Sequence, residues 1–278
     1  MNNSTLNFIS LESSTNSTTD SIGLKSLDIC LYSINMLFGL PAHFYIIWLI
    51  FTGTKNGVAS EFFILNMSVC ELGCSLNSLF CILIIFIQFS HLTTLTNFLR
   101  GLVITGSPLF HCLICVERYL AVVHPVTFLK FKPLRYRVIC CTVAWIITLG
   151  SCLCCIFTVD HRYIYVWFFS LQYLLFFFIQ LFCLVAVLRA LKQSGPGERG
   201  REKEVENHMK KRAFRIILIT IVTMVVIYVP FTIVGFSVIV TQHNIMALFY
   251  FALACNMLGC FVQPVHYLNH AGKCWFIS

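Results

Sequence analysis

The sequence predicts an all-α membrane protein whose seven transmembrane helices form a bundle, with the N-terminus outside and the C-terminus in the cytoplasm. Hydrophobic residues make up 58% of the 278 residues and charged residues only 11%, whereas soluble domains contain about 45–50% apolar residues. Seven apolar stretches each reach the length of about 20 residues that a helix needs to cross the hydrocarbon layer. Basic residues gather in alternate connections between these stretches, which is typical of a polytopic membrane protein.

Each apolar stretch is expected to form one helix. Lipid offers no hydrogen-bond partners, so a spanning segment must satisfy its backbone groups internally. The stretches are too long for the strands of a membrane β-barrel, which need only about 9–11 residues. In chain order they cover residues 27–51, 62–89, 95–120, 138–158, 163–189, 212–240 and 246–269.

The distribution of basic residues orients this bundle. Apart from Arg100 and Arg118 inside the third stretch, 15 of the 17 remaining Lys and Arg residues fall on one side, and only Lys25 and Arg162 fall on the other. Basic residues are enriched in cytoplasmic loops. We therefore expect an extracellular tail (1–26), the seven-helix domain (27–269) and a short cytoplasmic tail (270–278). The net charge of +8 follows from this asymmetry and indicates contact with membrane lipids, not with nucleic acid.

The N-terminal tail is rich in Ser, Thr and Asn and lacks the basic start and apolar core of a cleavable signal peptide. We expect the first span to act as its own signal. Acceptor sequons at Asn2, Asn3 and Asn16 predict a glycosylated tail. Such three-residue patterns also occur by chance in Ser/Thr-rich sequence.

Cysteine is abundant, with 15 residues, but nearly all of them lie inside the apolar stretches. Buried cysteines act as small apolar side chains. Their spacing does not match that of zinc ligands, and the segment 158–173 contains no cysteine for a disulfide in the second outer loop. The sequence therefore predicts no disulfide, no metal site and no cofactor.

Charged residues mark the end of the third stretch, where Glu117, Arg118 and Tyr119 precede a basic loop. A charge inside a spanning segment is costly and normally faces the bundle interior. The run Glu117 to Pro125 resembles the D/E-R-Y-L-A-x-x-x-P signature of the rhodopsin-like G-protein-coupled receptors. The resemblance covers almost the whole chain, and its other landmarks are the motif at 65–72, Trp145, Pro230, and Gln263, Pro264 and Tyr267 of an N-P-x-x-Y-like motif.

Several positions depart from the family pattern. The usual second-span Asp is Glu71, the usual first-span Asn is His43, and the usual seventh-span Asn is Gln263. Tyr228 stands where relatives carry a sixth-span Trp. The third span lacks its outer cysteine, so the resemblance implies a bundle without the family disulfide.

The resemblance also implies a switch. In the family, the arginine matching Arg118 is held by its acidic neighbour at rest and is released when the sixth helix swings outward to admit a heterotrimeric G protein. Lys210 stands where many relatives carry a second acid, which leads to the hypothesis of basal signalling; alternatively, Glu206 replaces that acid. The predicted switch residues are Glu117, Arg118, Tyr119, Lys210, Tyr228, Pro230, Pro264 and Tyr267.

A polar core is expected in mid-bundle from His43, Glu71, Ser107 and Gln263. In relatives the matching residues bind sodium. Because Glu is longer than Asp and His43 can donate a hydrogen bond, we favour a proton-coupled or purely structural cluster over a sodium site.

Arg100 is the main indication of a ligand. It precedes Arg118 by 18 residues, which is five full turns of about 3.6 residues, so a regular helix would put both arginines on the face that also carries Ser107. A guanidinium in an outer pocket suits a carboxylate or phosphate. We expect an extracellular anionic small molecule or lipid as ligand; alternatively, Arg100 reaches the headgroups or pairs with Asp160. The candidate ligand-binding residues are Arg100, Arg162, Tyr163, His243 and Tyr250.

Other functions fit the sequence less well. An enzyme would need a nucleophile beside a base, and a transporter would need paired charges and repeated broken helices; neither pattern is present. Cys274, just after the last stretch, is a candidate palmitoylation site. The sequence thus predicts a multi-pass receptor of the plasma membrane. The alternative is a receptor-like membrane protein that acts in trafficking or as a dimer partner without coupling.

Overall fold

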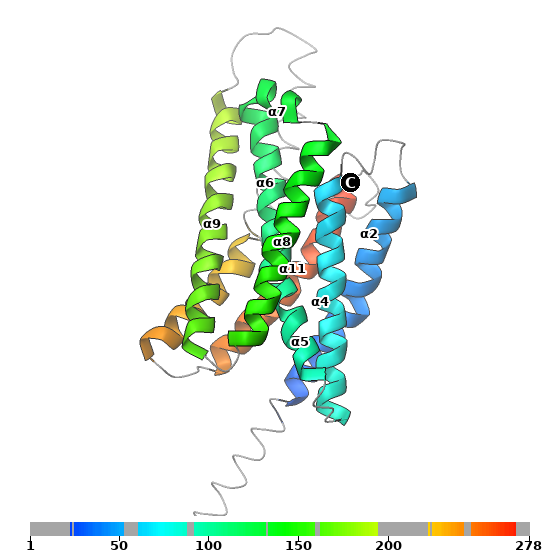
Figure 1. Cartoon of the computed structure of the whole chain (residues 1–278), viewed down its shortest axis with the longest axis vertical. Helices are drawn as coiled ribbons and strands as arrows, with labels where there is room; N and C mark the ends of the chain where they lie inside the picture. Colours follow the sequence, from blue (N-terminus) through cyan, green and yellow to red (C-terminus); the bar gives the residue numbers. More distant parts are fainter. Residues whose placement is uncertain are drawn as a thin grey trace, which may run out of the picture.

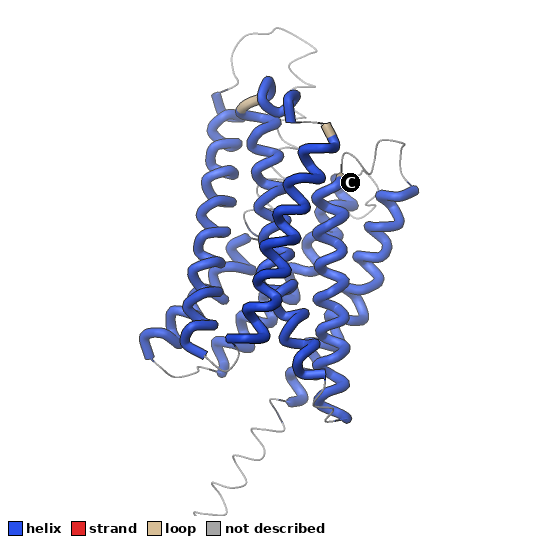
Figure 2. The backbone as a smooth tube through the Cα atoms, in the orientation of Figure 1, coloured by secondary structure: helices blue, strands red, loops and turns tan. Residues whose placement is uncertain are grey.

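The computed structural model describes residues 25–52, 61–87, 92–131, 133–158, 162–193, 224–241 and 246–270, together with Gly23 and Val222. Within these ranges the chain is helical and contains no strand (Figure 2). Six of the described helices are long and apolar enough to cross a membrane, and Ala247–Gly259 forms a shorter apolar stretch within a seventh. The prediction of an all-α bundle of seven spans is confirmed.

The seven helices follow the predicted stretches closely. The first, Lys25–Thr52, contains a π-helical segment, η1 (Asn35–Gly39), followed by α2 (Leu40–Thr52). The third consists of α5 (Leu92–Gly101), η2 (Leu102–Gly106) and α6 (Ser107–Val123). The others are α4 (Phe62–Ile87), α8 (Leu134–Thr158), α9 (Arg162–Gln193), the sixth span Met224–Thr241 and α11 (Met246–His270). Residues 212–221 of the predicted sixth stretch lie outside the described residues.

The third span is the centre of the bundle. Its lower part in Figure 1, α5 with η2, packs against α4 and α8, and α6 packs against α4 and α9. At the far edge α11 packs against α2 and η1, bringing the last span beside the first. This arrangement leaves large apolar side chains such as Trp48, Phe157 and Phe182 exposed on the outside, as expected of helices that face lipid.

Small residues allow the third and fourth spans to approach each other closely at η2. A Cβ atom added to Gly101 would lie 2.4 Å from the Cα atom of Cys152, so the two backbones are almost in contact. Next to this point the hydroxyls of Thr105 and Ser151 are hydrogen-bonded, and Gln172 of α9 donates to Thr105 at 2.9 Å. Small side chains and interhelical hydrogen bonds are the usual means of packing helices in lipid.

The first and second spans are joined by a similar contact. In η1 the side chain of Asn35 donates to the hydroxyl of Ser78 on α4 at 2.9 Å. A Cβ atom on Gly39 would come within 2.7 Å of the Asn35 side-chain oxygen. Glycine at this position therefore leaves room for the buried amide that links the two helices.

A short helix that the sequence did not predict follows the third span. His124 leaves the helical conformation (φ −130°, ψ 64°), and α7 (Pro125–Phe131) begins at the next residue. The residue before a proline avoids the α conformation, while proline itself is favoured at the first position of a helix. The connection that we expected to be a basic loop is therefore partly helical.

The cysteines in the described ranges are all free. Cys70, Cys152 and Cys155 are almost completely buried between helices. They fill space at the close contacts of the second, third and fourth spans, which is the role expected of small apolar side chains.

Gly101→Ala tests the close approach of the third and fourth spans. The added methyl group must push the helices apart, so we expect the free energy of unfolding to fall by about 1–3 kcal/mol. Gly150→Ala is the matched control, because nothing lies within 4 Å of a Cβ atom built there. Thermal denaturation of the two purified variants in detergent measures the difference. Equal stability of the two variants would show that the contact does not limit packing.

Candidate functional site

A cavity of about 570 Å³ opens inside the bundle. Its volume lies in the range of about 300–1,000 Å³ that is usual for small-molecule sites. Its described wall comes from the first, second, third, fifth, sixth and seventh spans, and none of the lining residues belongs to α8. Six of the seven spans therefore contribute to the described cavity wall, so a movement of any of them would change the shape of the cavity.

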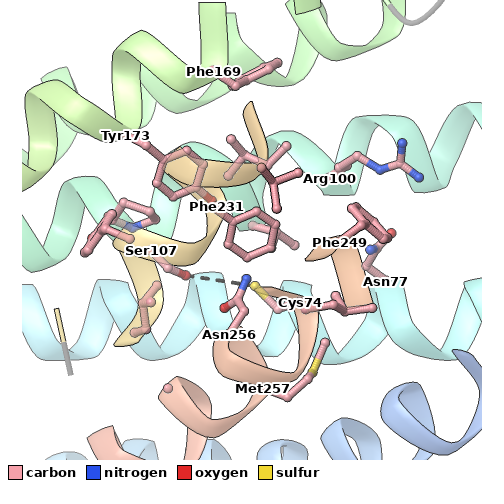
Figure 3. A pocket seen from close by; sticks show the side chains of 18 of the residues that line it. Cys74, Asn77, Arg100, Ser107, Phe169, Tyr173, Phe231, Phe249, Asn256 and Met257 are labelled. Carbon is pink, nitrogen blue, oxygen red and sulfur yellow. Dashed lines mark hydrogen bonds between the residues drawn. The ribbon is translucent and has the colours of Figure 1, made fainter. Parts of the chain in front are cut away.

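The chemistry of this wall changes along the cavity. Arg100 lies at one end, the polar residues Cys74, Ser107 and Asn256 lie at the other, and aromatic side chains lie between them (Figure 3). Tyr173 and Phe231 stack in the middle with ring centroids 5.7 Å apart and an interplanar angle of 9°. The other lining residues are mostly apolar and include Val103, Ile104, Phe169, Val234, Val238 and Leu253.

At the first end, Arg100 is exposed in the last turn of α5 and is hydrogen-bonded to the hydroxyl of Tyr165 on α9. Tyr32 and Cys81 are hydrogen-bonded to each other nearby, close enough for both Arg100 and Asp28 to act on them electrostatically. Asp28 is thus an acid close to this end that the sequence reasoning missed. Asp160, the acid that we considered, lies outside the described residues.

The predicted ligand-binding residues are only partly placed at the cavity. Arg100 lines it, whereas Tyr250 is not among the lining residues and donates to the Asp28 carboxylate at 3.1 Å. The neighbouring Phe249 of α11 lines the cavity instead. Arg162 and Tyr163 begin α9, but their side chains, like the whole of His243, lie outside the described part of the chain.

At the polar end, the predicted core residues Glu71 and Ser107 both line the cavity and are nearly buried. Ser107 lies 3.9 Å from the Cys74 thiol. His43 is completely buried on α2 and does not line the cavity. The sequence reasoning missed Asn256, which precedes Gln263 by two helical turns; the side chain of Gln263 itself is outside the described atoms. Whether this cluster holds a proton or an ion stays a prediction.

A buried polar triad connects the cavity to the packing of the third, fifth and sixth spans. The amide nitrogen of Gln180 on α9 lies 3.0 Å from the Tyr228 hydroxyl and 3.2 Å from the Cys112 sulfur. Tyr228 also lines the cavity and packs edge-on against Tyr173, with ring centroids 5.6 Å apart. The polar Gln180 in the apolar run around 174–184 was a sequence signal for this site, because an isolated polar group in lipid needs a partner.

At the opposite end of the third span, Glu117 is ion-paired with Arg137 of α8. Both side chains are largely buried, whereas that of Arg118 is exposed. Tyr119 hydrogen-bonds to His124 at 3.1 Å and packs against Phe182 of α9. We expected Glu117 to hold Arg118, and the structure pairs it with the neighbouring helix instead.

The helical register between Arg100 and Arg118 also differs from our expectation. The prediction that both share one face with Ser107 assumed a regular helix, but η2 inserts π-helical turns between Arg100 and Ser107. A π turn takes more residues than an α turn. The interval therefore cannot be counted as five regular turns, and while Arg100 and Ser107 both line the cavity, Arg118 lies at the far end with an exposed side chain.

Comparison with known proteins agrees with this architecture. Residues 43–164 match the family model described as the 7 transmembrane receptor (rhodopsin family). The match covers less than half of the chain and, with the relatives below, supports a rhodopsin-like seven-transmembrane receptor. This receptor is accordingly a multi-pass protein of the plasma membrane, and its relatives are receptors, not enzymes.

Individual relatives are distant. The uracil nucleotide/cysteinyl leukotriene receptor of Rattus norvegicus is 24% identical over 225 residues, which cover 73% of this chain and 64% of the relative. Proteinase-activated receptor 1 of Xenopus laevis is 23% identical over 188 residues, covering 58% and 43%. C-C chemokine receptor type 8 of Homo sapiens is 24% identical over 236 residues, covering 76% and 63%. The alignments thus span just under two thirds of the length of the first of these relatives.

Two landmarks of the family motif contact each other in this receptor. The indole nitrogen of Trp145 on α8 donates to the side-chain oxygen of Asn66 on α4 at 2.9 Å. The amide of Asn66 donates in turn to the backbone of Phe62, and Phe110 of the third span packs against the Trp145 ring. The second, third and fourth spans are held together there.

A double-mutant cycle tests the buried triad. Gln180→Leu leaves the hydroxyl of Tyr228 buried without its donor, which should lower the free energy of unfolding by about 1–3 kcal/mol. Adding Tyr228→Phe removes that stranded hydroxyl, so the double variant should lose less stability than the sum of the two single losses. Thermal or denaturant unfolding of the four purified proteins gives the coupling. Strictly additive losses would show that the two side chains do not depend on each other.

Proposed function

We propose that this receptor transmits the binding of an extracellular ligand, held in the cavity near Arg100, to a heterotrimeric G protein at the Arg118 side of the bundle. In this proposal the N-terminus is extracellular and the C-terminus cytoplasmic, as the distribution of basic residues indicates. The sixth helix moves outward to open the G-protein site. The observation that carries the proposal is the state of Arg118, whose guanidinium group is exposed while its acidic neighbour is paired elsewhere.

The Glu117–Arg137 pair supports a readily available Arg118. A carboxylate already engaged by one guanidinium attracts a second one less strongly, since part of its charge is compensated. Lys210, which lies outside the described residues, would add repulsion from the sixth span. We therefore expect signalling above background without ligand.

A continuous series of contacts links the two ends of the proposed pathway. Tyr228 forms part of the cavity wall, Gln180 binds its hydroxyl, and the same amide binds Cys112 on α6. Arg118 is on α6 as well. A ligand that displaces Tyr228 must therefore disturb contacts of both the fifth and third spans, which is the type of two-state coupling that a switch requires.

The ligand is proposed to be an anionic small molecule or lipid. Arg100 provides a guanidinium group at the cavity end, and no ion pair compensates it among the residues described. Relatives named for a uracil nucleotide and a cysteinyl leukotriene support a small organic ligand. Pro230, Pro264 and Tyr267 as further switch residues, glycosylation at Asn2, Asn3 and Asn16, and lipidation at Cys274 stay parts of the proposal.

Arg118→Ala tests coupling directly. Guanine-nucleotide exchange is measured on the purified receptor reconstituted with G proteins of each class. We expect basal exchange by the wild type, and its reduction to the receptor-free rate in Arg118→Ala, because the cationic contact to the G protein is lost. Absence of exchange by a folded wild-type receptor with every G-protein class would favour the non-coupling alternative, in which the protein acts in trafficking or as a dimer partner.

Arg137→Ala tests the role of the ion pair. Without Arg137, Glu117 is free to turn to Arg118 and restrain it, so basal nucleotide exchange should fall several-fold while the protein remains folded. Arg135→Ala is the matched control: Arg135 lies on the same helix but stacks on Tyr136. Basal exchange that is unchanged, or that falls equally in both variants, would contradict this role of the pair.

A further inference from the structure

The distribution of charge and apolar surface in the cavity defines its ligand more closely than the proposed function does. Arg100 is the only Lys or Arg among the described lining residues, and Glu71 lies on the wall at the opposite end. His111 is the one other basic side chain on the described wall. A ligand with more negative charges than Arg100 and His111 can pair would bury charge without a partner, which is strongly unfavourable. The cavity fits one anionic group, not a polyphosphate.

The anionic end is well supplied with hydrogen-bond donors. Arg100 is bonded to the oxygen of Tyr165. A guanidinium group carries five N–H donors and a phenol one O–H donor, so these two side chains have further hydrogens to offer a ligand. Tyr32 and Asn77 also line this cavity, and Figure 3 shows Asn77 on the side of Arg100. A planar carboxylate can accept two parallel bonds from a guanidinium.

Next to the expected position of the carboxylate, the cavity wall is suited to the apolar part of a ligand. Phe231 lies in the middle of the view in Figure 3, with Tyr173 next to it and Phe169 further out on α9, and Ile104 and Val238 also line the cavity. Arg100 and Ser107 are seven residues apart on the third span, and because η2 lies between them the rise is less than the about 10 Å of a regular α-helix. A chain or ring system of that length would bury its apolar surface against these side chains.

We infer that the cavity binds a single-headed organic acid, with its carboxylate on Arg100 and an extended apolar body between the aromatic side chains of the fifth and sixth spans. The inner end accepts a neutral hydrogen-bonding group beside Ser107 and Asn256. It rejects a second carboxylate, which would lie next to Glu71 and far from Arg100. This inference rests on the proposed function for the assignment of the cavity as the ligand site.

A homologous series tests the inference by direct binding. The full-length receptor is reconstituted in phosphatidylcholine nanodiscs without G protein, and binding of hexanoic, octanoic, decanoic and dodecanoic acid is measured by equilibrium dialysis. Each methylene buried should tighten binding about fourfold until the cavity is filled. Because acids also partition into lipid, the relevant signal is the difference between wild type and Arg100→Gln in identical nanodiscs.

Analogues of one chain length separate the contribution of the carboxylate to binding from that of the apolar chain. Decanamide should bind at least tenfold more weakly than decanoic acid to the wild type, and equally weakly to Arg100→Gln. 10-Hydroxydecanoic acid should bind at least as well as decanoic acid, whereas decanedioic acid and uridine diphosphate should not compete. Val234→Phe, which narrows the cavity from the sixth span, should shift the optimal chain to a shorter length and so report on the body independently of Arg100.

The results separate this inference from the proposed function. Arg100-dependent binding without nucleotide exchange would support the ligand class and contradict coupling. Nucleotide exchange driven by the receptor without any Arg100-dependent binding of the acids would support coupling and contradict the ligand class. Chain-length dependence that is identical in wild type and Arg100→Gln, or displacement of decanoic acid by uridine diphosphate, would overturn the inference.

Discussion

Polar groups inside this bundle have no water to bind, and that constraint organises the structure. Every backbone group must be satisfied within a helix, and the buried polar side chains must find partners on neighbouring helices. Asn35 with Ser78, Asn66 with Trp145, and Gln180 with Tyr228 each join two spans in this way. These pairs specify which faces meet, a task that apolar contacts perform poorly when the surrounding lipid is equally apolar.

The third span concentrates these contacts because it lies between the second, fourth and fifth spans. Gly101, directly before the π-helical segment, lies against the backbone of α8, and within the segment Thr105 binds Ser151 and accepts from Gln172. The same segment sets the register of Arg100 relative to Ser107, and hence the two ends of the cavity wall. Helix packing and the shape of the candidate site therefore depend on one local irregularity.

The number, order and approximate bounds of the helices were predictable because the length of an apolar stretch is a property of the sequence alone. The family was predictable from Glu117 to Pro125 and the landmarks that follow in order. The π segments were not, since no local pattern marks them, and the close contacts at Gly39 and Gly101 depend on which helix lies opposite. Likewise the partner of Glu117 lies 20 residues away on another helix, and motif resemblance directed attention to the adjacent Arg118 instead.

In the candidate site, the sequence reasoning found three of the polar residues that line the cavity and missed other polar residues close to it. Arg100, Glu71 and Ser107 were singled out by their polarity and spacing, and all three line the cavity. Asp28 and Gln180 were overlooked, although a polar residue within an apolar run was itself a signal. Their roles depend on which helix lies opposite, and this follows only from the three-dimensional packing.

The single amide nitrogen of Gln180 has one further consequence for how the bundle responds. Its two hydrogens face two acceptors, the oxygen of Tyr228 and the sulfur of Cys112, so a small rotation of the sixth helix strands one hydrogen in a dry interior. Intermediate positions of the sixth helix therefore have a higher free energy than either of its end positions. We expect ligands of different efficacy to change the fraction of molecules in each of two arrangements, without creating a graded series of helix positions.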